Sequence, residues 1–166
     1  MIRDLVAAGV ALLLLILAAS LGTTLTFYRK RRRQNRERER ALGRTIIAEI
    51  PADDDLVLFT EDGRQFHYGA QSVDKDAVAA VRVLINGAPI AACVSKRHAA
   101  EARIQPTAFE DRPEGIARDR WDVAIERTNG AVLVECGAIR ERISQELARA
   151  VFDAVKRDIE LRDAAS

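Results

Sequence analysis

Residues 121–137 have the sequence WDVAIERTNGAVLVECG, in which a turn pair separates two segments that alternate apolar and polar residues. The pair Asn129-Gly130 favours the positive φ angles of a two-residue hairpin turn. Counting outward from it places six residues on one face: Trp121, Val123, Ile125, Val132, Val134 and Cys136. The opposite face carries Asp122, Glu126 and Glu135, so we expect it to face water. The stretch predicts an antiparallel hairpin with one buried face.

Two more turn pairs of this kind lie upstream. Asp62-Gly63 separates LVLFTE from RQFHYG, and its register pairs Glu61 with Arg64 and Phe59 with Phe66. These would be an opposite-charge pair and an aromatic pair across the strands. Three hairpins with period-two patterning together predict an antiparallel sheet.

The middle hairpin has Asn86-Gly87 between AAVRVLI and APIAACV. Its register predicts that one face carries six residues: Val81, Val83, Ile85, Ala88, Ile90 and Ala92. The alanine-rich start of the first arm, from Asp76, also suits a helical turn.

A strand at Thr45–Ile50, ended by Pro51, should precede the hairpins, and an acidic loop at Asp53–Asp55 follows it. An amphipathic helix from about Ile139 to Leu161 should follow them. Its apolar stripe comprises Ile139, Ile143, Leu147, Ala150, Val151 and Ala154, widened by Phe152, Val155 and Ile159. Its polar face comprises Arg142, Gln145, Arg149, Asp153, Lys156 and Glu160. This stripe would cover one side or an open end of the sheet. An alternative, a free membrane-surface helix, is disfavoured because the polar face is as acidic as it is basic.

The predicted fold class is α+β: an antiparallel sheet or partly open barrel of about six to seven strands with one C-terminal helix, in a domain at residues 45–166. Seven strands followed by one helix resembles, in element order from Thr45 to Leu161, the pleckstrin-homology-like superfold. Lipid-binding members of that superfold grip phosphoinositides through basic residues around their first hairpin, where this chain has Asp53–Asp55. The resemblance therefore implies protein binding rather than headgroup recognition. A plainer α+β sandwich fits the same pattern.

Before this domain, Leu5–Phe27 has the sequence LVAAGVALLLLILAASLGTTLTF, without charge, proline or amide. A helix of this length can cross a hydrocarbon core about 30 Å thick. The stretch predicts a transmembrane helix at residues 5–27. An alternative is a cleaved signal peptide ending near Ala18-Ala19-Ser20, but the positive charge follows the apolar run instead of preceding it.

The basic neck, residues 28–44, holds nine basic and two acidic residues, whereas residues 45–166 hold sixteen basic and twenty-two acidic ones. The positive-inside rule therefore places residues 1–4 outside the cell and the C-terminal domain in the cytoplasm, at the inner (plasma) membrane of a bacterium. The bacterial origin is indicated by the abundance of arginine and alanine, typical of GC-rich coding sequences.

Six residues of the neck should contact anionic lipid headgroups: Arg29, Lys30, Arg31, Arg32, Arg33 and Arg36. Nucleic-acid binding is disfavoured because no aromatic residues are interleaved to stack on bases. Opposite charges three residues apart, as in Arg36/Glu39, favour a helix through the neck, which Gly43 should end.

The segment at residues 95–120 is long and irregular, with mixed charges and breaks at Pro106, Pro113 and Gly115. Segments of this kind within a compact domain are often functional. Four residues are candidates for contact with a protein partner: Arg103, Phe109, Arg112 and Arg118.

Nothing in the sequence predicts a catalytic, cofactor or metal site. His67 and His98 have no ligand partner at a recognised metal spacing. Cys136 would point into the core as a structural thiol, and the two cysteines suit a reducing compartment. No phosphate-binding loop or dinucleotide fingerprint is present.

We therefore expect a non-catalytic, single-pass membrane protein whose cytoplasmic domain docks onto other proteins, as an accessory, scaffold or assembly subunit of a membrane complex. The first alternative is a small membrane-tethered enzyme or ligand-binding domain that uses Cys136, Cys93 or the histidines. The second is a lipid sensor that acts through the neck.

Overall fold

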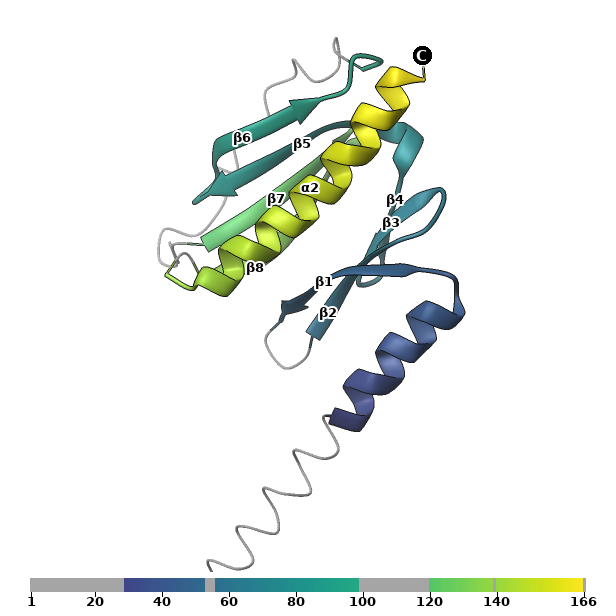
Figure 1. Cartoon of the computed structure of the whole chain (residues 1–166). Helices are drawn as coiled ribbons and strands as arrows, with labels where there is room; N and C mark the ends of the chain where they lie inside the picture. Colours follow the sequence, from purple (N-terminus) through teal and green to yellow (C-terminus); the bar gives the residue numbers. More distant parts are fainter. Residues whose placement is uncertain (1–28, 53–55, 99–119, 139, 166) are drawn as a thin grey trace, which may run out of the picture. The chain divides into compact units, whose positions relative to one another are not determined.

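The computed structural model describes residues 29–52, 56–98, 120–138 and 140–165 (Figure 1). The chain divides into two compact units, Met1–Leu42 and Gly43–Ser166. No helix within the four described ranges is long and apolar enough to cross a membrane. The predicted span, residues 5–27, lies outside these ranges.

In the first unit, residues 29–41 form a helix. Its last turn is closed by the Leu42 N–H, which donates to the Arg38 carbonyl at 3.1 Å. Gly43 follows with φ 75°, the left-handed conformation that commonly ends a helix. Arg33 Nε contacts Glu37 Oε1 at 2.8 Å, one turn apart. The prediction that the neck is helical and ends at Gly43 is confirmed.

The second unit has the predicted α+β class, with two antiparallel four-stranded sheets and a C-terminal helix. Sheet A has the order β1-β2-β3-β4, with β1 Thr45–Pro51, β2 Leu56–Glu61, β3 Gln65–Tyr68 and β4 Gln71–Asp74. Sheet B has the order β6-β5-β7-β8, with β5 Val78–Ile85, β6 Ala88–Val94, β7 Arg120–Arg127 and β8 Gly130–Ala138. A 3-10 helix, η1 Lys75–Ala77, joins the sheets, and α2 Arg142–Ala164 follows β8.

The described residues thus form eight strands in two sheets, not one sheet of six to seven strands. The strand missed from the sequence is β4, which is short and polar and lacks a period-two apolar pattern. It pairs with β3 across a turn at Gly69, which adopts φ 59°. The helical turn expected before the second hairpin is present as η1.

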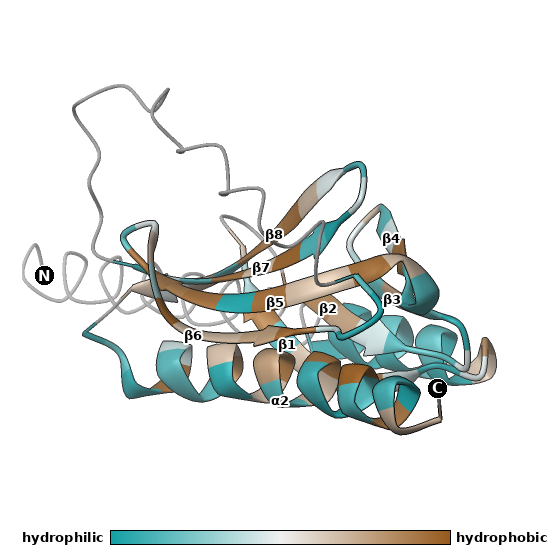
Figure 2. Ribbon diagram, turned by 90° about the horizontal axis from the view of Figure 1, so that it is seen from above, coloured by the Kyte–Doolittle hydropathy of each residue, from teal (hydrophilic) through white to brown (hydrophobic). Residues whose placement is uncertain are grey.

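The core lies between α2, sheet A and the inner face of sheet B, and α2 runs along that face (Figures 1 and 2). Phe59 and Phe66 are both fully buried and stack with their ring centroids 5.8 Å apart. The predicted aromatic contact is therefore present, although the strand register differs.

The first hairpin has a longer loop than its Asp-Gly pair predicts. Glu61 pairs with Phe66 and Phe59 with Tyr68, so the predicted pair of Glu61 with Arg64 is wrong. Asp62 is responsible, because its Oδ1 accepts the N–H groups of Arg64 and Gln65 at 2.7 and 2.8 Å. This side-chain turn widens the loop.

In the third hairpin the turn lies one residue earlier than predicted, since Arg127 pairs with Gly130 and Ile125 with Val132. Each of these β7 residues therefore pairs two positions away from its predicted partner on β8. Because side chains alternate with a period of two, the residues stay on their predicted faces of the sheet. Five of the six predicted inward residues are buried: Val123, Ile125, Val132, Val134 and Cys136. The sixth, Trp121, is partly buried against them.

The opposite face of sheet B is drier than predicted, because Asp122 is only 2% exposed. Arg120 compensates this buried charge, with its Nε 2.9 Å from Asp122 Oδ2, and its NH2 lies 2.8 Å from Glu135 Oε1. On the neighbouring strands, Arg82 Nε contacts Glu126 Oε1 at 2.7 Å. Asp122 and Glu126 are thus held in largely buried ion pairs, whereas Glu135 is exposed, as the sequence predicts.

Helix α2 begins three residues later than expected, and its buried stripe is rotated. The buried residues are Ser144, Ala148, Val151, Ala154, Val155 and Ile159. Ile143 is 62% exposed, so its predicted place in the stripe is wrong, and Leu161 at the C-terminal end is 65% exposed. Gly137 permits the close approach of the first turn, because a Cβ there would lie 2.6 Å from Ser144 Oγ.

Candidate functional site

The clearest candidate site in the described residues is the edge of sheet B that β6 forms; β8 is the other outer strand. Among the described strands, β6 pairs with β5 alone. Its sequence APIAACV carries no charge, and six of its seven residues are exposed; Cys93 is half-buried. Figure 2 draws the strand mostly in pale to brown hydrophobic tones at the border of the sheet. An uncharged, exposed edge strand is a template for pairing with another chain.

The turn before β6 fixes where this edge begins. Asn86 and Gly87 adopt φ 52° and 83°, and Ile85 pairs with Ala88, as the sequence predicts for a two-residue turn. A register shift between Val83 and Leu84 then changes the pairing.

This shift overturns the predicted faces of β6. Beyond it, Val83 pairs with Ala91 and Val81 with Cys93, so Ala91 and Cys93 take the positions expected of Ile90 and Ala92. Ile90 does not share the buried face of Val81 and Val83, and it is 55% exposed. A bulge leaves one residue without a cross-strand partner and redirects the side chains that follow.

The register also shows which backbone groups of β6 are free. The Ser95 N–H donates to the Ala79 carbonyl at 2.8 Å, so Ser95 faces β5. Because successive residues of an antiparallel strand alternate in direction, Ala91 and Cys93 also face β5, whereas Ala92 and Val94 direct their N–H and C=O groups away from it. Those two residues form the open ladder of the edge.

Contacts with α2 hold the end of β6 in place. Asp163 accepts from Ser95 Oγ at 2.9 Å and from the Lys96 N–H at 2.8 Å. Burial raises the pKa of Asp163, but these hydrogen bonds outweigh it and leave the pKa below its usual value. Arg97 NH2 donates to the Arg162 carbonyl at 2.6 Å. The residues that follow β6 are therefore fixed against α2.

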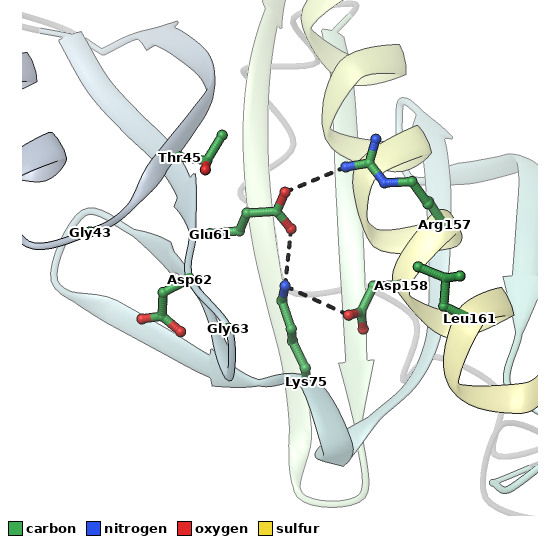
Figure 3. Close-up of a pocket in the computed structure, with 9 residues that line it drawn as sticks. All are labelled: Gly43, Thr45, Glu61, Asp62, Gly63, Lys75, Arg157, Asp158 and Leu161. Atoms are coloured by element: carbon green, nitrogen blue, oxygen red, sulfur yellow. Dashed lines mark hydrogen bonds and ion pairs between the residues drawn. The ribbon is translucent and has the colours of Figure 1, made fainter. Parts of the chain in front are cut away.

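A second candidate is a polar pocket of about 320 Å³ between the first hairpin and α2 (Figure 3). Lys75 Nζ lies at its centre, 3.0 Å from Glu61 Oε2 and 3.6 Å from Asp158 Oδ1. Arg157 NH2 lies 3.4 Å from Glu61 Oε1, and Arg162 NH2 lies 2.8 Å from Asp158 Oδ2.

The charges of this pocket satisfy one another. The side chain of Lys75 is 13% exposed and its ammonium also lies 4.7 Å above the Phe66 ring, a cation–π distance. A ligand anion would have to displace Glu61 or Asp158 from the cations. The cluster therefore acts as a brace between sheet A and α2, and we do not assign it a ligand.

His67 lies beside the pocket and is nearly buried. Its Nε2 is 2.7 Å from Asp62 Oδ2. This contact, with the N–H groups of Arg64 and Gln65, holds the pKa of Asp62 well below its usual range. The pair stabilises the hairpin loop. His98 Nε2 lies 3.1 Å from the Asp76 carbonyl oxygen.

The two thiols differ in their surroundings. Cys136 is fully buried, and burial raises its pKa to about 12, with the nearby Asp122 charge adding to the effect. A thiol of that pKa is protonated at neutral pH and is a poor nucleophile. The prediction that Cys136 is a buried core residue is confirmed. Burial also raises the pKa of the half-buried Cys93.

The six predicted lipid contacts of the neck all lie on the helix at residues 29–41. Arg29 to Arg33 are exposed and Arg36 is half-buried. A helix places these cations within one short segment, as the lipid-binding prediction requires. The four candidate loop residues, Arg103, Phe109, Arg112 and Arg118, lie outside the described residues, so the structure does not bring them to any site.

Sequence reasoning missed the β6 edge because it placed Ile90 on the same face of the hairpin as Val81 and Val83. The signal was present in Pro89, which lacks an N–H and is confined to edge strands or bulges within sheets. Within the described ranges, no group of three His, Cys, Asp or Glu residues could hold a metal ion. Comparison with known proteins finds no matching family model, curated protein or solved structure.

Proposed function

We propose that this chain is a single-pass membrane-anchored protein whose cytoplasmic domain binds other proteins through the β6 edge, as an accessory, scaffold or assembly subunit of a bacterial membrane complex. The observation that carries the proposal is the uncharged β6 strand, which is mostly exposed and pairs, among the described strands, with β5 alone. Strand addition gives affinity through main-chain hydrogen bonds and specificity through alternate side chains.

The anchoring part of the proposal is supported by charge and length. Leu5–Phe27 is uncharged and long enough to span a bilayer, and the helix behind it presents consecutive cations from Arg29 to Arg33. Each cation near an anionic leaflet contributes on the order of 1 kcal/mol of attraction. On this proposal the neck holds lipid headgroups and the domain works at the membrane surface.

The alternative of a tethered enzyme has less support from the described residues. Cys136 is protonated and buried, and the charges of the pocket around Lys75 are used internally. Neither arrangement presents a nucleophile or an acid–base pair to a substrate.

Two experiments test the proposal on the full-length chain. A fluorescent-protein fusion at the C-terminus should fluoresce in cells, and an alkaline-phosphatase fusion at the same point should be inactive. Affinity capture from detergent-solubilised membranes should recover other proteins with the wild-type chain and with Ser72→Lys on β4, but not with Ala92→Lys on β6. Both substitutions add one lysine to an exposed edge strand, so they differ only in the edge that they alter. An active phosphatase fusion, or equal capture by all three chains, would contradict the proposal.

A further inference from the structure

We infer that the strand which completes the β6 edge is β6 of a second copy of this chain, so that two domains join their B sheets across a two-fold axis. The inference rests on the proposed function, because it names the occupant of the same edge. Its first support is the position of β6 as the outer strand of sheet B, with Ala92 and Val94 directing their backbone groups outward.

The geometry of the open ladder suits self-pairing. In an antiparallel pair centred on Cys93, Ala92 of one copy lies opposite Val94 of the other, and the reverse pair follows by symmetry. Ala92 and Val94 direct their N–H and C=O groups away from β5, so each of these two pairs can exchange main-chain hydrogen bonds. A two-fold interface needs a surface of this self-complementary kind.

The side chains of β6 are compatible with a second copy of the same strand. Val94 is 40% exposed, and the pairing would place it beside an alanine of the other copy. Because β6 has no charge, no like charges oppose each other along the joined strands. A charged peptide would find no charge on β6 to pair with.

The residues that flank β6 favour the antiparallel direction. Lys96 and Arg97 are the first charges after the strand. Antiparallel pairing puts these cations at opposite ends of the joined strands, whereas parallel pairing would bring them together. Anchoring both copies in one membrane would also raise the effective concentration of each for the other.

Pro89 and the bulge after it limit the contact to the second half of β6. Pro89 offers no N–H, and Ile90 falls where the register shifts. The segment that pairs symmetrically about Cys93 is therefore Ala92–Val94. A contact this short predicts a dimer that depends on protein concentration and on anchoring, not a permanent one.

The test is the mass of the full-length chain in detergent micelles, measured by light scattering with the detergent contribution subtracted, across a range of protein concentrations. We expect wild type to shift from monomer to dimer as concentration rises. Ala92→Lys should raise the dissociation constant of the dimer at least about tenfold, and Ser72→Lys should leave that constant unchanged. Ala92→Pro is a second variant, because it removes an outward N–H without breaking the β5–β6 ladder. Circular dichroism of each variant checks that it is folded.

Three outcomes would overturn the inference. The first is a wild-type chain that stays at the monomer mass at every concentration. The second is a dimer that persists in both Ala92 variants, which would place the contact in the span. The third is a monomeric chain whose capture of a different protein still depends on Ala92. In that last outcome the proposed function would stand and only the second copy would be rejected. The converse result is a dimer that Ala92→Lys dissociates, in a chain that captures no other protein. It would support pairing with a second copy and contradict the proposed binding of other proteins.

Discussion

The edge strands β4 and β6 are built in opposite ways. The outer strands of sheet A are β1 and β4, and β4 has four residues, three of them exposed and polar: Gln71, Ser72 and Asp74. The outer strands of sheet B are β6 and β8, and β6 has seven residues, none of them charged. Short, polar edges are a common device against pairing with other chains, and long, apolar edges lack that protection.

The difference extends to what lies beside each edge. Next to β4, Lys75 joins Glu61 and Asp158 and ties sheet A to α2. Next to β6, the contacts of Asp163 hold only the end of the strand and leave its length open. Ion pairs thus tie sheet A to α2, whereas β6 presents an uncharged edge suited to a partner. Each prediction below tests one side of this contrast.

The largest effect should come from the buried side of sheet A. Phe66→Ala removes a fully buried ring that stacks on Phe59, and it should lower the free energy of unfolding by about 3–5 kcal/mol. Ile90→Ala on the exposed edge should change it by less than about 0.5 kcal/mol. Urea titration of the full-length chain, followed by the fluorescence of its single tryptophan, measures both values. Similar losses for the two variants would mean that β6 is packed as tightly as the core.

The next effect concerns how sheet B meets α2. Gly137→Ala should cost roughly 2–3 kcal/mol, because residue 137 has φ 112° and an added Cβ would lie 2.6 Å from Ser144 Oγ. The double variant with Ser144→Ala should recover only part of the loss, since the strained backbone remains. The same urea titration gives both values. Full recovery would show that steric contact with the hydroxyl was the whole cost.

The ionic brace of sheet A should contribute less. Lys75→Met keeps most of the side-chain volume over Phe66 but leaves Glu61 and Asp158 without their shared cation, at a cost of about 1–2 kcal/mol. A double-mutant cycle with Glu61→Gln should give a positive coupling energy that decreases with added salt. A coupling energy of zero would mean that the contact between Lys75 and Glu61 does not stabilise the fold.

The smallest effect is the pH dependence of the first hairpin. Asp62 has a pKa below its usual value in the folded chain, so its contribution to stability is complete above the unfolded pKa of about 4 and is lost as pH falls below it. The free energy of unfolding should therefore drop more steeply from about pH 5 to pH 3 in wild type than in Asp62→Asn. We expect a modest difference because the Asp62 side chain is 31% exposed. Parallel pH profiles for the two chains would contradict the assigned role of the Asp62–His67 pair.

Much of the fold could be predicted from local pattern. Alternation of apolar residues around Asn86-Gly87 and Asn129-Gly130 located four of the strands, and the spacing of Val151, Val155 and Ile159 located the buried side of α2. These patterns are local because side-chain direction repeats every two residues in a strand and every 3.6 in a helix.

The candidate site could not be predicted in the same way. Whether Ile90 faces the core depends on the register shift between Val83 and Leu84, and nothing in β6 alone specifies a bulge. Whether β6 lies at an edge depends on β7, about thirty residues later, taking the other side of β5. The burial of Asp122 likewise depends on Arg120 and on the packing of sheet B.

Residue order alone was sufficient for the α+β class, the terminal helix, the helical neck and the inward faces of the hairpin at residues 121–137, since each follows from short-range periodicity and turn chemistry. It also predicts an anchor and a topology at the membrane. The division into two sheets, the exposed edge and the paired buried charges came only from the tertiary arrangement. Long-range strand pairing decides which neighbours a residue has, and those neighbours determine whether an apolar strand is core or surface.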